Sequence, residues 1–337
     1  MKALALTVLL AGCSVAERPF APPSVPLSEP RRLCTSNTQS DCRSVSSVER
    51  LLHDPDLHIL EAVSTPAGRQ GAKVLTLRRD GVVLRAKWRS FDSGNLVNEP
   101  RKELGAYAVQ QLYLSPEDYV IPPTAGHCFP LAEYRARVDA TATPSFGTRC
   151  VFGFLSYWLP NAHDVDDAED QGILGGDSLY DEELFRTDTV YRRSLVNLNV
   201  TAFLVHHADA HDAQFLLVKD SGSVRVYTVD NSMAFQSITN PMVLFREDWA
   251  TLRVPLVDTK TRARIAAIDE RALQALATVE EYEDRDGMLT PHAITDPTVQ
   301  RDAGMRWFGK RLQVGLTQGE IAGVRSRVQE LKQRLAE

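Results

Sequence analysis

The residues with the clearest chemical potential lie around two strand-like runs in the middle of the chain. Asp209 precedes the first run, "FLLVK", and Asp230 follows the second, "VRVYTV". Residues 220–222, Asp-Ser-Gly, separate the runs and predict a hairpin turn. A hairpin returns the chain to the end where it began, so we expect the two carboxylates to lie side by side, with Gln214 between them.

Two carboxylates and an amide oxygen at one point are suited to Mg²⁺, which prefers oxygen ligands. One carboxylate could equally orient or deprotonate an attacking hydroxyl group. Phosphoryl transfer needs both functions, because the metal neutralises phosphate charge while an Asp positions the nucleophile. A zinc site built on His207, Asp209 and His211 is the alternative. It is disfavoured because no distant His-rich segment completes its ligands.

The strand pattern is clearest in the first third of the chain. Residues 72–79, "AKVLTLRR", and 82–88, "VVLRAKW", flank Asp80-Gly81, which is a strong two-residue hairpin turn. Residues 99–114 follow with apolar side chains at helical spacing. The aromatic run "CVFGFLSYWLP", residues 150–160, predicts a buried strand.

Helical patterns dominate the rest of the chain. Residues 189–205 are predicted to form a helix, and residues 241–337 are expected to be helical with loops. The acidic stretch 164–183 lacks the spacing of a calcium loop and is expected to be a solvated lid or insertion. Together these patterns predict an α+β fold with a small β-rich lobe over residues 44–160 and a larger helical lobe over residues 161–337.

The motifs and their order resemble those of protein-kinase-like folds. "HADAHDAQFLL" is similar to the "HxDxxxxN" catalytic loop, with Asp209 at the position of the base and Gln214 where Asn usually stands. "VDNSMAF" is similar to the "DN" form of the metal-binding motif, at Asp230. These variants are typical of the phosphatidylinositol-kinase-like and secretory-pathway (Golgi casein kinase-like) branches.

The N-terminal half extends the same resemblance. "TPAGRQGAKVLTL" is similar to a nucleotide-covering glycine loop without the usual G-x-G-x-x-G, and Gly68 and Gly71 would let backbone amides approach phosphate. Lys87, in "LRAKWRS", stands where a lysine contacts the α- and β-phosphates. Glu103 stands where a helix carboxylate pairs with that lysine, with Glu99 as a rival. "GFLSYWLP" would line the adenine pocket.

The resemblance covers residues 49–235 and implies an ATP-dependent phosphotransferase that uses Mg²⁺ or Mn²⁺. Asp209 would hold the acceptor hydroxyl of a protein or small molecule, and Asp230 and Gln214 would hold the metal. Two other function classes stay open. A catalytically inactive pseudokinase, binding a ligand or partner, is consistent with Gln214 and with scarce periplasmic ATP. A nucleotidyl transferase would instead move AMP to its acceptor.

The N-terminus predicts export. "MKALALTVLLAGC" has one positive charge at Lys2 and then an apolar run, which is the pattern of a short signal peptide over residues 1–12. Its last four residues resemble a bacterial lipobox, which implies lipidation of Cys13 and a lipid-anchored location in the bacterial cell envelope, with the membrane as a partner. Residues 13–43 are rich in proline and predict a tether that ends in a polar loop.

Four further cysteines, an even number in an exported chain, predict two disulfides. Three pairings are possible. Cys34 and Cys42 bracket a polar loop, which favours a local bridge and leaves Cys128 to pair with Cys150; free buried thiols are the alternative. The net charge of −6 and the dispersed Lys and Arg argue against a nucleic-acid partner.

Overall fold

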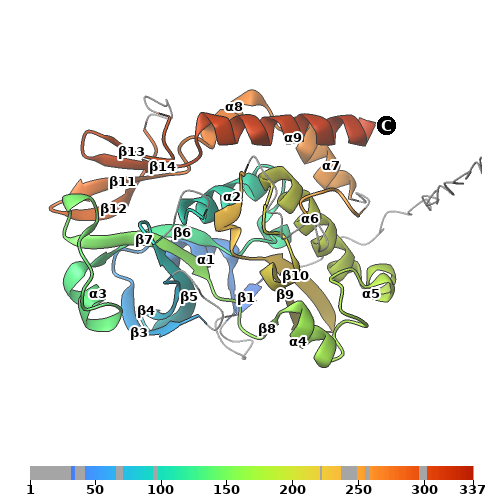
Figure 1. Ribbon diagram of the computed structural model, residues 1–337, viewed down its shortest axis with the longest axis horizontal. Coiled ribbons are helices and arrows are strands. Elements are labelled where there is room, and N and C mark those ends of the chain that lie inside the picture. Colours follow the sequence, from blue (N-terminus) through green and yellow to red (C-terminus); the bar gives the residue numbers. More distant parts are fainter. Residues whose placement is uncertain are drawn as a thin grey trace, which may run out of the picture.

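The protein has an α+β fold, as expected, in which antiparallel sheets are packed with helices (Figure 1). None of the helices described here combines the length and the apolar character that crossing a membrane requires. The computed structural model describes residues 32–34, 42–65, 71–93, 98–220, 222–236, 249–254, 258–295 and 302–336.

The largest sheet has five antiparallel strands in the order β3-β4-β5-β7-β6. The predicted hairpin is confirmed, because Asp80 and Gly81 both have positive φ between β4 and β5, as a tight two-residue turn requires. The strands are β3 (His58–Ser64), β4 (Lys73–Arg79), β5 (Val82–Ser90), β6 (Thr124–Pro130) and β7 (Cys150–Tyr157).

Short helices accompany this sheet. α2 (Arg101–Gln111) contacts β6 and β7 and confirms the predicted helix. The other elements of the N-terminal half are β1 (Arg32–Cys34), β2 (Cys42–Ser44), α1 (Val45–Leu52), η2 (Pro116–Asp118), α3 (Leu131–Arg137) and η3 (Ser145–Gly147).

The second hairpin and its helix also agree with the sequence patterns. α6 (Thr189–Val205) contacts β10, and β9 pairs with β10 in an antiparallel register. β8 adds a third strand beside β9. The acidic stretch contains two short helices. The elements are β8 (Ala162–His163), α4 (Val165–Asp170), α5 (Glu182–Thr187), η4 (Asp212–Gln214), β9 (Phe215–Asp220), β10 (Ser223–Thr228) and η5 (Asn231–Met233).

The C-terminal part corrects one expectation. Residues 241–337 were expected to be helical, but a four-stranded antiparallel sheet in the order β12-β11-β14-β13 lies between α8 and α9. β11 reads "EEYEDR", which has no strand-like apolar pattern, so pairing with β12 and β14 decides its conformation. The elements are α7 (Thr259–Ala267), α8 (Glu270–Ala275), β11 (Glu280–Arg285), β12 (Met288–His292), β13 (Met305–Phe308), β14 (Arg311–Val314) and α9 (Gln318–Ala336).

This C-terminal sheet packs against β6 and β7, far from it in sequence (Figure 1). Part of residues 161–337, which were predicted to form the helical lobe, is therefore a β-sheet. It packs against β6 and β7, which were assigned to the other lobe. The shared apolar cluster is buried and contains Leu104, Cys128, Cys150, Phe152, Phe154, Tyr282, Leu289, Leu312 and Val314.

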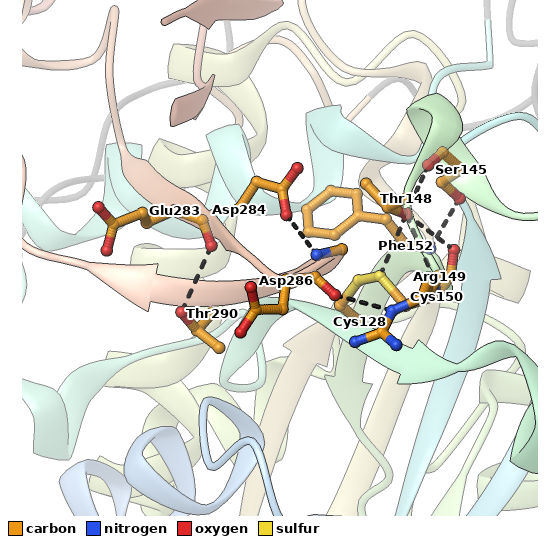
Figure 2. The surroundings of a disulfide bond; sticks show 11 residues. Cys128, Ser145, Thr148, Arg149, Cys150, Phe152, Glu283, Asp284, Asp286 and Thr290 are labelled. Carbon is orange, nitrogen blue, oxygen red and sulfur yellow. Dashed lines mark hydrogen bonds between the residues drawn. A yellow bond between two sulfur atoms is a disulfide. The ribbon is translucent and has the colours of Figure 1, made fainter. Parts of the chain in front are cut away.

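A disulfide between Cys128 and Cys150 joins β6 to β7 inside this cluster, with the two Cα atoms 5.6 Å apart, as the sequence analysis expected (Figure 2). Figure 2 also shows Arg149 beside the β11–β12 turn, where its Nε donates to the Asp286 carbonyl at 2.7 Å. In the other predicted bridge, Cys34 and Cys42 are backbone partners of β1 and β2. Their side chains lie outside the described residues.

Candidate functional site

The β9–β10 hairpin brings the segments of Asp209 and Asp230 together at one end. The first residue of β9 pairs with the last residue of β10. Beyond that pair, the backbone N–H of Val229 donates to the Gln214 carbonyl at 2.9 Å, and Asp230 follows directly. The arrangement that the spacing predicted is therefore present in the backbone.

The carboxylate of Asp209 is held by two side chains of its own loop. Gln214 Nε2 donates to Asp209 Oδ2 at 3.2 Å, and His211 Nε2 lies 3.4 Å from Oδ1. His211 Nδ1 accepts the Ala213 N–H, so a neutral His211 carries its proton on Nε2, facing Asp209. The Asp209 N–H donates to His207 Nδ1 at 3.3 Å. These contacts fix the direction in which a 23% exposed carboxylate points.

The imidazole of His207 lies near both carboxylates. It is fully buried, and burial lowers its pKa, although Asp209 and Asp230 each favour its charged form. His207 is consequently neutral near pH 7 and acts as a fixed hydrogen-bonding group under the loop.

Lys87 joins three elements that are distant in sequence. Its Nζ lies 2.8 Å from Glu103 Oε1, on α2, and 2.9 Å from Asp230 Oδ1, after β10. Glu103 Oε2 also accepts the backbone N–H of Asn231 at 3.3 Å. One ammonium group and one helix carboxylate therefore connect the five-stranded sheet, α2 and the end of the β9–β10 hairpin.

The three charged side chains differ in their exposure to solvent. The side chain of Glu103 is 6% exposed, that of Lys87 is 16% exposed and that of Asp230 is 41% exposed. Burial disfavours the charged form of Lys87, but the two carboxylates outweigh it and raise its pKa. Burial likewise opposes ionisation of Asp230, but Lys87 outweighs it and holds the pKa of Asp230 well below its usual range. Lys87 and Asp230 are therefore both charged at neutral pH.

The backbone at Asp230 is shaped to present its carboxylate. Asp230 adopts a left-handed conformation (φ 54°, ψ 47°), which Asp tolerates better than most residues but which still carries a cost. Ser232 Oγ donates to Asp230 Oδ1 at 2.9 Å. Ser232 was not among the residues predicted from the sequence, since no motif distinguishes it from other serines.

The donor set is compatible with Mg²⁺. This ion is commonly held by one or two carboxylates, and its remaining positions are taken by water and substrate phosphates. Asp230 Oδ2 has no hydrogen-bond partner among the described residues, and the Gln214 amide stands at the same end of the hairpin. Within the described residues no group of three or more His, Cys, Asp or Glu side chains gathers as a metal-binding cluster. Substrate phosphates and water would therefore have to supply the remaining oxygen ligands of a Mg²⁺ ion bound by Asp230 and Gln214.

The remaining predicted residues have mixed outcomes. Glu99 contacts Arg101 at 2.9 Å, so the rival of Glu103 does not pair with Lys87. Gly71 has a φ of 73°, a conformation that favours glycine, and a side chain there would meet open space. Gly68 and Cys13 lie outside the described residues.

Neither a protein-family model nor a curated protein matches this sequence.

Proposed function

We propose that this chain has a two-lobed protein-kinase-like fold of the phosphatidylinositol-kinase-like and Golgi casein kinase-like type. It transfers phosphate from ATP, with Mg²⁺ or Mn²⁺, to a hydroxyl group of a protein or small molecule. One observation carries the proposal: Lys87, on a central strand, contacts both Glu103 on α2 and Asp230 after a hairpin. A lysine between a helix carboxylate and a metal-binding Asp is the arrangement that kinase-like phosphoryl transfer requires.

The order of elements supports the same proposal. A five-stranded antiparallel sheet with α2 beside β6 and β7 comes first in the chain, and α6 and the β9–β10 hairpin follow. The expected catalytic loop lies between α6 and β9, and the expected metal-binding Asp comes just after β10. The site thus draws on both parts of the chain, with Lys87 bridging them.

In this mechanism each residue has a separate task. Lys87, held by Glu103, binds the α- and β-phosphates of ATP. The oxygen of the acceptor hydroxyl bonds to the γ-phosphorus, and Asp209 accepts the proton of that hydroxyl. The bond between that phosphorus and the bridging oxygen breaks, ADP leaves and the proton passes from Asp209 to water. A divalent cation bound by Asp230 and Gln214 would neutralise phosphate charge.

A binding module without chemistry is the second candidate. Gln214 Nε2 is engaged with Asp209 Oδ2, so the amide restrains the carboxylate that would receive the proton. A protein of this kind would bind a nucleotide without turning it over.

Calorimetry of the purified protein with ATP and Mn²⁺ or Mg²⁺ tests the proposal. We expect metal-dependent binding that weakens at least about tenfold in Asp230→Asn, because a charge-assisted interaction is lost. Asp56→Asn is the matched control, since that carboxylate is 65% exposed and its salt bridge within the described residues is with Arg79. Absence of nucleotide binding to the unsubstituted protein would refute the kinase-like function.

Turnover separates the catalytic alternatives. We expect Asp209→Asn to keep ATP binding and to lose ADP formation, because the proton acceptor is gone. Mass spectrometry of modified products distinguishes added phosphate from added AMP. Binding without any turnover would favour the pseudokinase.

The proposal includes export and a lipid anchor at Cys13, which would hold the protein in the bacterial cell envelope with the membrane as a partner. Cys13→Ser should then move the protein from the membrane fraction to the soluble fraction. Unchanged membrane association of this variant would contradict the anchor.

A further inference from the structure

Helix α2 is buried on every side, although many of its residues are polar. Arg101, Lys102, Glu103 and Gln110 are all buried, together with the apolar residues between them. A buried charge is stable only when it is paired and hydrogen-bonded, so each of these side chains needs a partner on a surrounding element. Lys87 is the partner of Glu103, whereas Arg101 pairs both with Glu99 and with Glu320 from the C-terminal part of the chain.

Arg101 forms a bidentate ion pair with Glu320 in the first turn of α9. Nη1 and Nη2 each lie 2.9 Å from one oxygen of Glu320, and both side chains are at most 10% exposed. Nη1 also donates to the Gly315 carbonyl at 3.2 Å. Burial opposes ionisation of Glu320, but Arg101 outweighs it and lowers the pKa of Glu320. This geometry is the strongest form of a charged hydrogen bond.

Glu320 is fixed by its own helix at the same time. Its Oε2 accepts the Thr317 N–H at 2.8 Å, and Thr317 Oγ1 accepts the Glu320 N–H at 3.2 Å, which is a reciprocal capping box. The carboxylate that binds Arg101 is therefore part of the start of α9. Figure 1 shows α9 running above α2.

The packing between the two segments is tight. A Cβ at Gly105, in the middle of α2, would lie 2.5 Å from Leu316 Cδ2. A Cβ at Gly304 would lie 2.2 Å from the Arg101 guanidinium. A side chain at either position would therefore require Leu316 or the Arg101 guanidinium to move.

We propose that residues 304–320 form a clamp that fixes α2 and so positions Glu103 against Lys87, with Arg101 and Glu320 as positioning residues. Glu103 lies two residues after Arg101 in the same helix, so a movement of the helix at Arg101 also moves Glu103. The clamp belongs to the same chain, so the Lys87–Glu103 pair is assembled without a partner protein or a modification. The inference rests on the proposed function for its catalytic meaning, but its structural part can be tested alone.

The test compares Glu320→Gln with Glu270→Gln in the full chain. Glu270 forms a bidentate pair with Arg325 on the same helix α9, but that pair is exposed. We expect Glu320→Gln to raise hydrogen exchange of α2 amides at least about tenfold, since local opening reflects the lost charged hydrogen bonds. Glu270→Gln should leave the exchange of α2 unchanged. Equal exchange in both variants would overturn the clamp.

Steady-state kinetics test whether the clamp matters for catalysis. We expect Glu320→Gln to raise KM for ATP more than it lowers kcat, because the displaced groups bind phosphate and Asp209 is untouched. If Glu320→Gln does not fold, Glu320→Asp provides a milder variant, because it keeps the charge but shortens the reach of the carboxylate toward Arg101. It should give a smaller change in the same direction, and no change in α2 exchange would refute the clamp. If the unsubstituted protein binds no ATP, the proposed function fails while the exchange result still decides the clamp.

Discussion

Replacement of Lys87 by Met should destabilise the protein by about 3 kcal/mol at pH 7, because it leaves a buried carboxylate without its cation. Glu103 is 6% exposed, so it carries most of this cost, whereas Asp230 is 41% exposed and stays hydrated. The free-energy cost of leaving Glu103 unpaired cannot exceed the cost of protonating its carboxylate. An unpaired buried carboxylate can take up a proton, and protonating a glutamate of ordinary pKa, about 4.3, costs about 3.7 kcal/mol at pH 7.

Because protonation limits this cost, the destabilisation caused by Lys87→Met depends on pH. Proton uptake by a glutamate of ordinary pKa costs only about 1 kcal/mol at pH 5. The penalty of Lys87→Met should therefore shrink from about 3 kcal/mol at pH 7 to about 1 kcal/mol at pH 5. The sign follows because the variant, unlike the unsubstituted protein, gains a proton on folding when the pH falls.

Urea unfolding followed by circular dichroism at the two pH values measures the effect. Lys73→Met is the matched control. Lys73 lies on the neighbouring strand β4, and its Nζ donates to the Ser64 hydroxyl at 3.3 Å without a salt bridge among the described residues, so its loss should cost below about 0.5 kcal/mol. The double variant Lys87→Met/Glu103→Gln should be less destabilised than the sum of its single variants. Equal costs for Lys87→Met and Lys73→Met, or a cost that does not shrink at pH 5, would refute this reasoning.

Three further predictions concern the elements around the site. The Cys128–Cys150 disulfide closes a loop with a sequence separation of 22, so replacing both cysteines by Ala should lower the unfolding free energy measured in urea by about 3 kcal/mol. Burial opposes the charged form of His53, but the Glu280 carboxylate 2.6 Å away outweighs it and raises the pKa of His53 to about 9. Its stabilising effect is complete below pH 6.5 and lost as the pH rises through about 9. It amounts to about 1–2 kcal/mol for an imidazole one third exposed, and Glu280→Gln should flatten this part of the stability profile. Asp188 accepts two N–H groups at the start of α6 and one from β10, so Asp188→Ala should lower the unfolding free energy by about 2 kcal/mol; a loss below half of this in urea unfolding would contradict the capping role.

Local pattern determined the pieces of the candidate site. Asp80-Gly81 predicted the β4–β5 hairpin, and the strand-like runs after Asp209 and before Asp230 predicted that the ends carrying them would meet. Both predictions rest on interactions between residues close in sequence, where turn conformation and strand alternation decide the outcome. The Cys128–Cys150 pairing followed from a count of cysteines and one polar loop.

Choices between equivalent residues needed the tertiary structure. Glu99 and Glu103 are both acidic, but Glu99 precedes α2 and contacts Arg101, whereas Glu103 lies within α2 and reaches Lys87. We infer that the position of α2 depends on Glu320, which lies more than 200 residues further along the chain and binds Arg101. No local pattern carries this information, because the energy of the pair comes from burial that the rest of the chain provides.

The C-terminal sheet shows the same limit. β11 alternates no apolar residues, yet it pairs with β12 and β14 and buries Tyr282 against the disulfide region. The sequence by itself determined the local turns, the helix starts and the order of the chemical groups. Only the tertiary structure decided which distant charge meets which, because long-range pairing and burial outweigh the weak local preference of a charged strand.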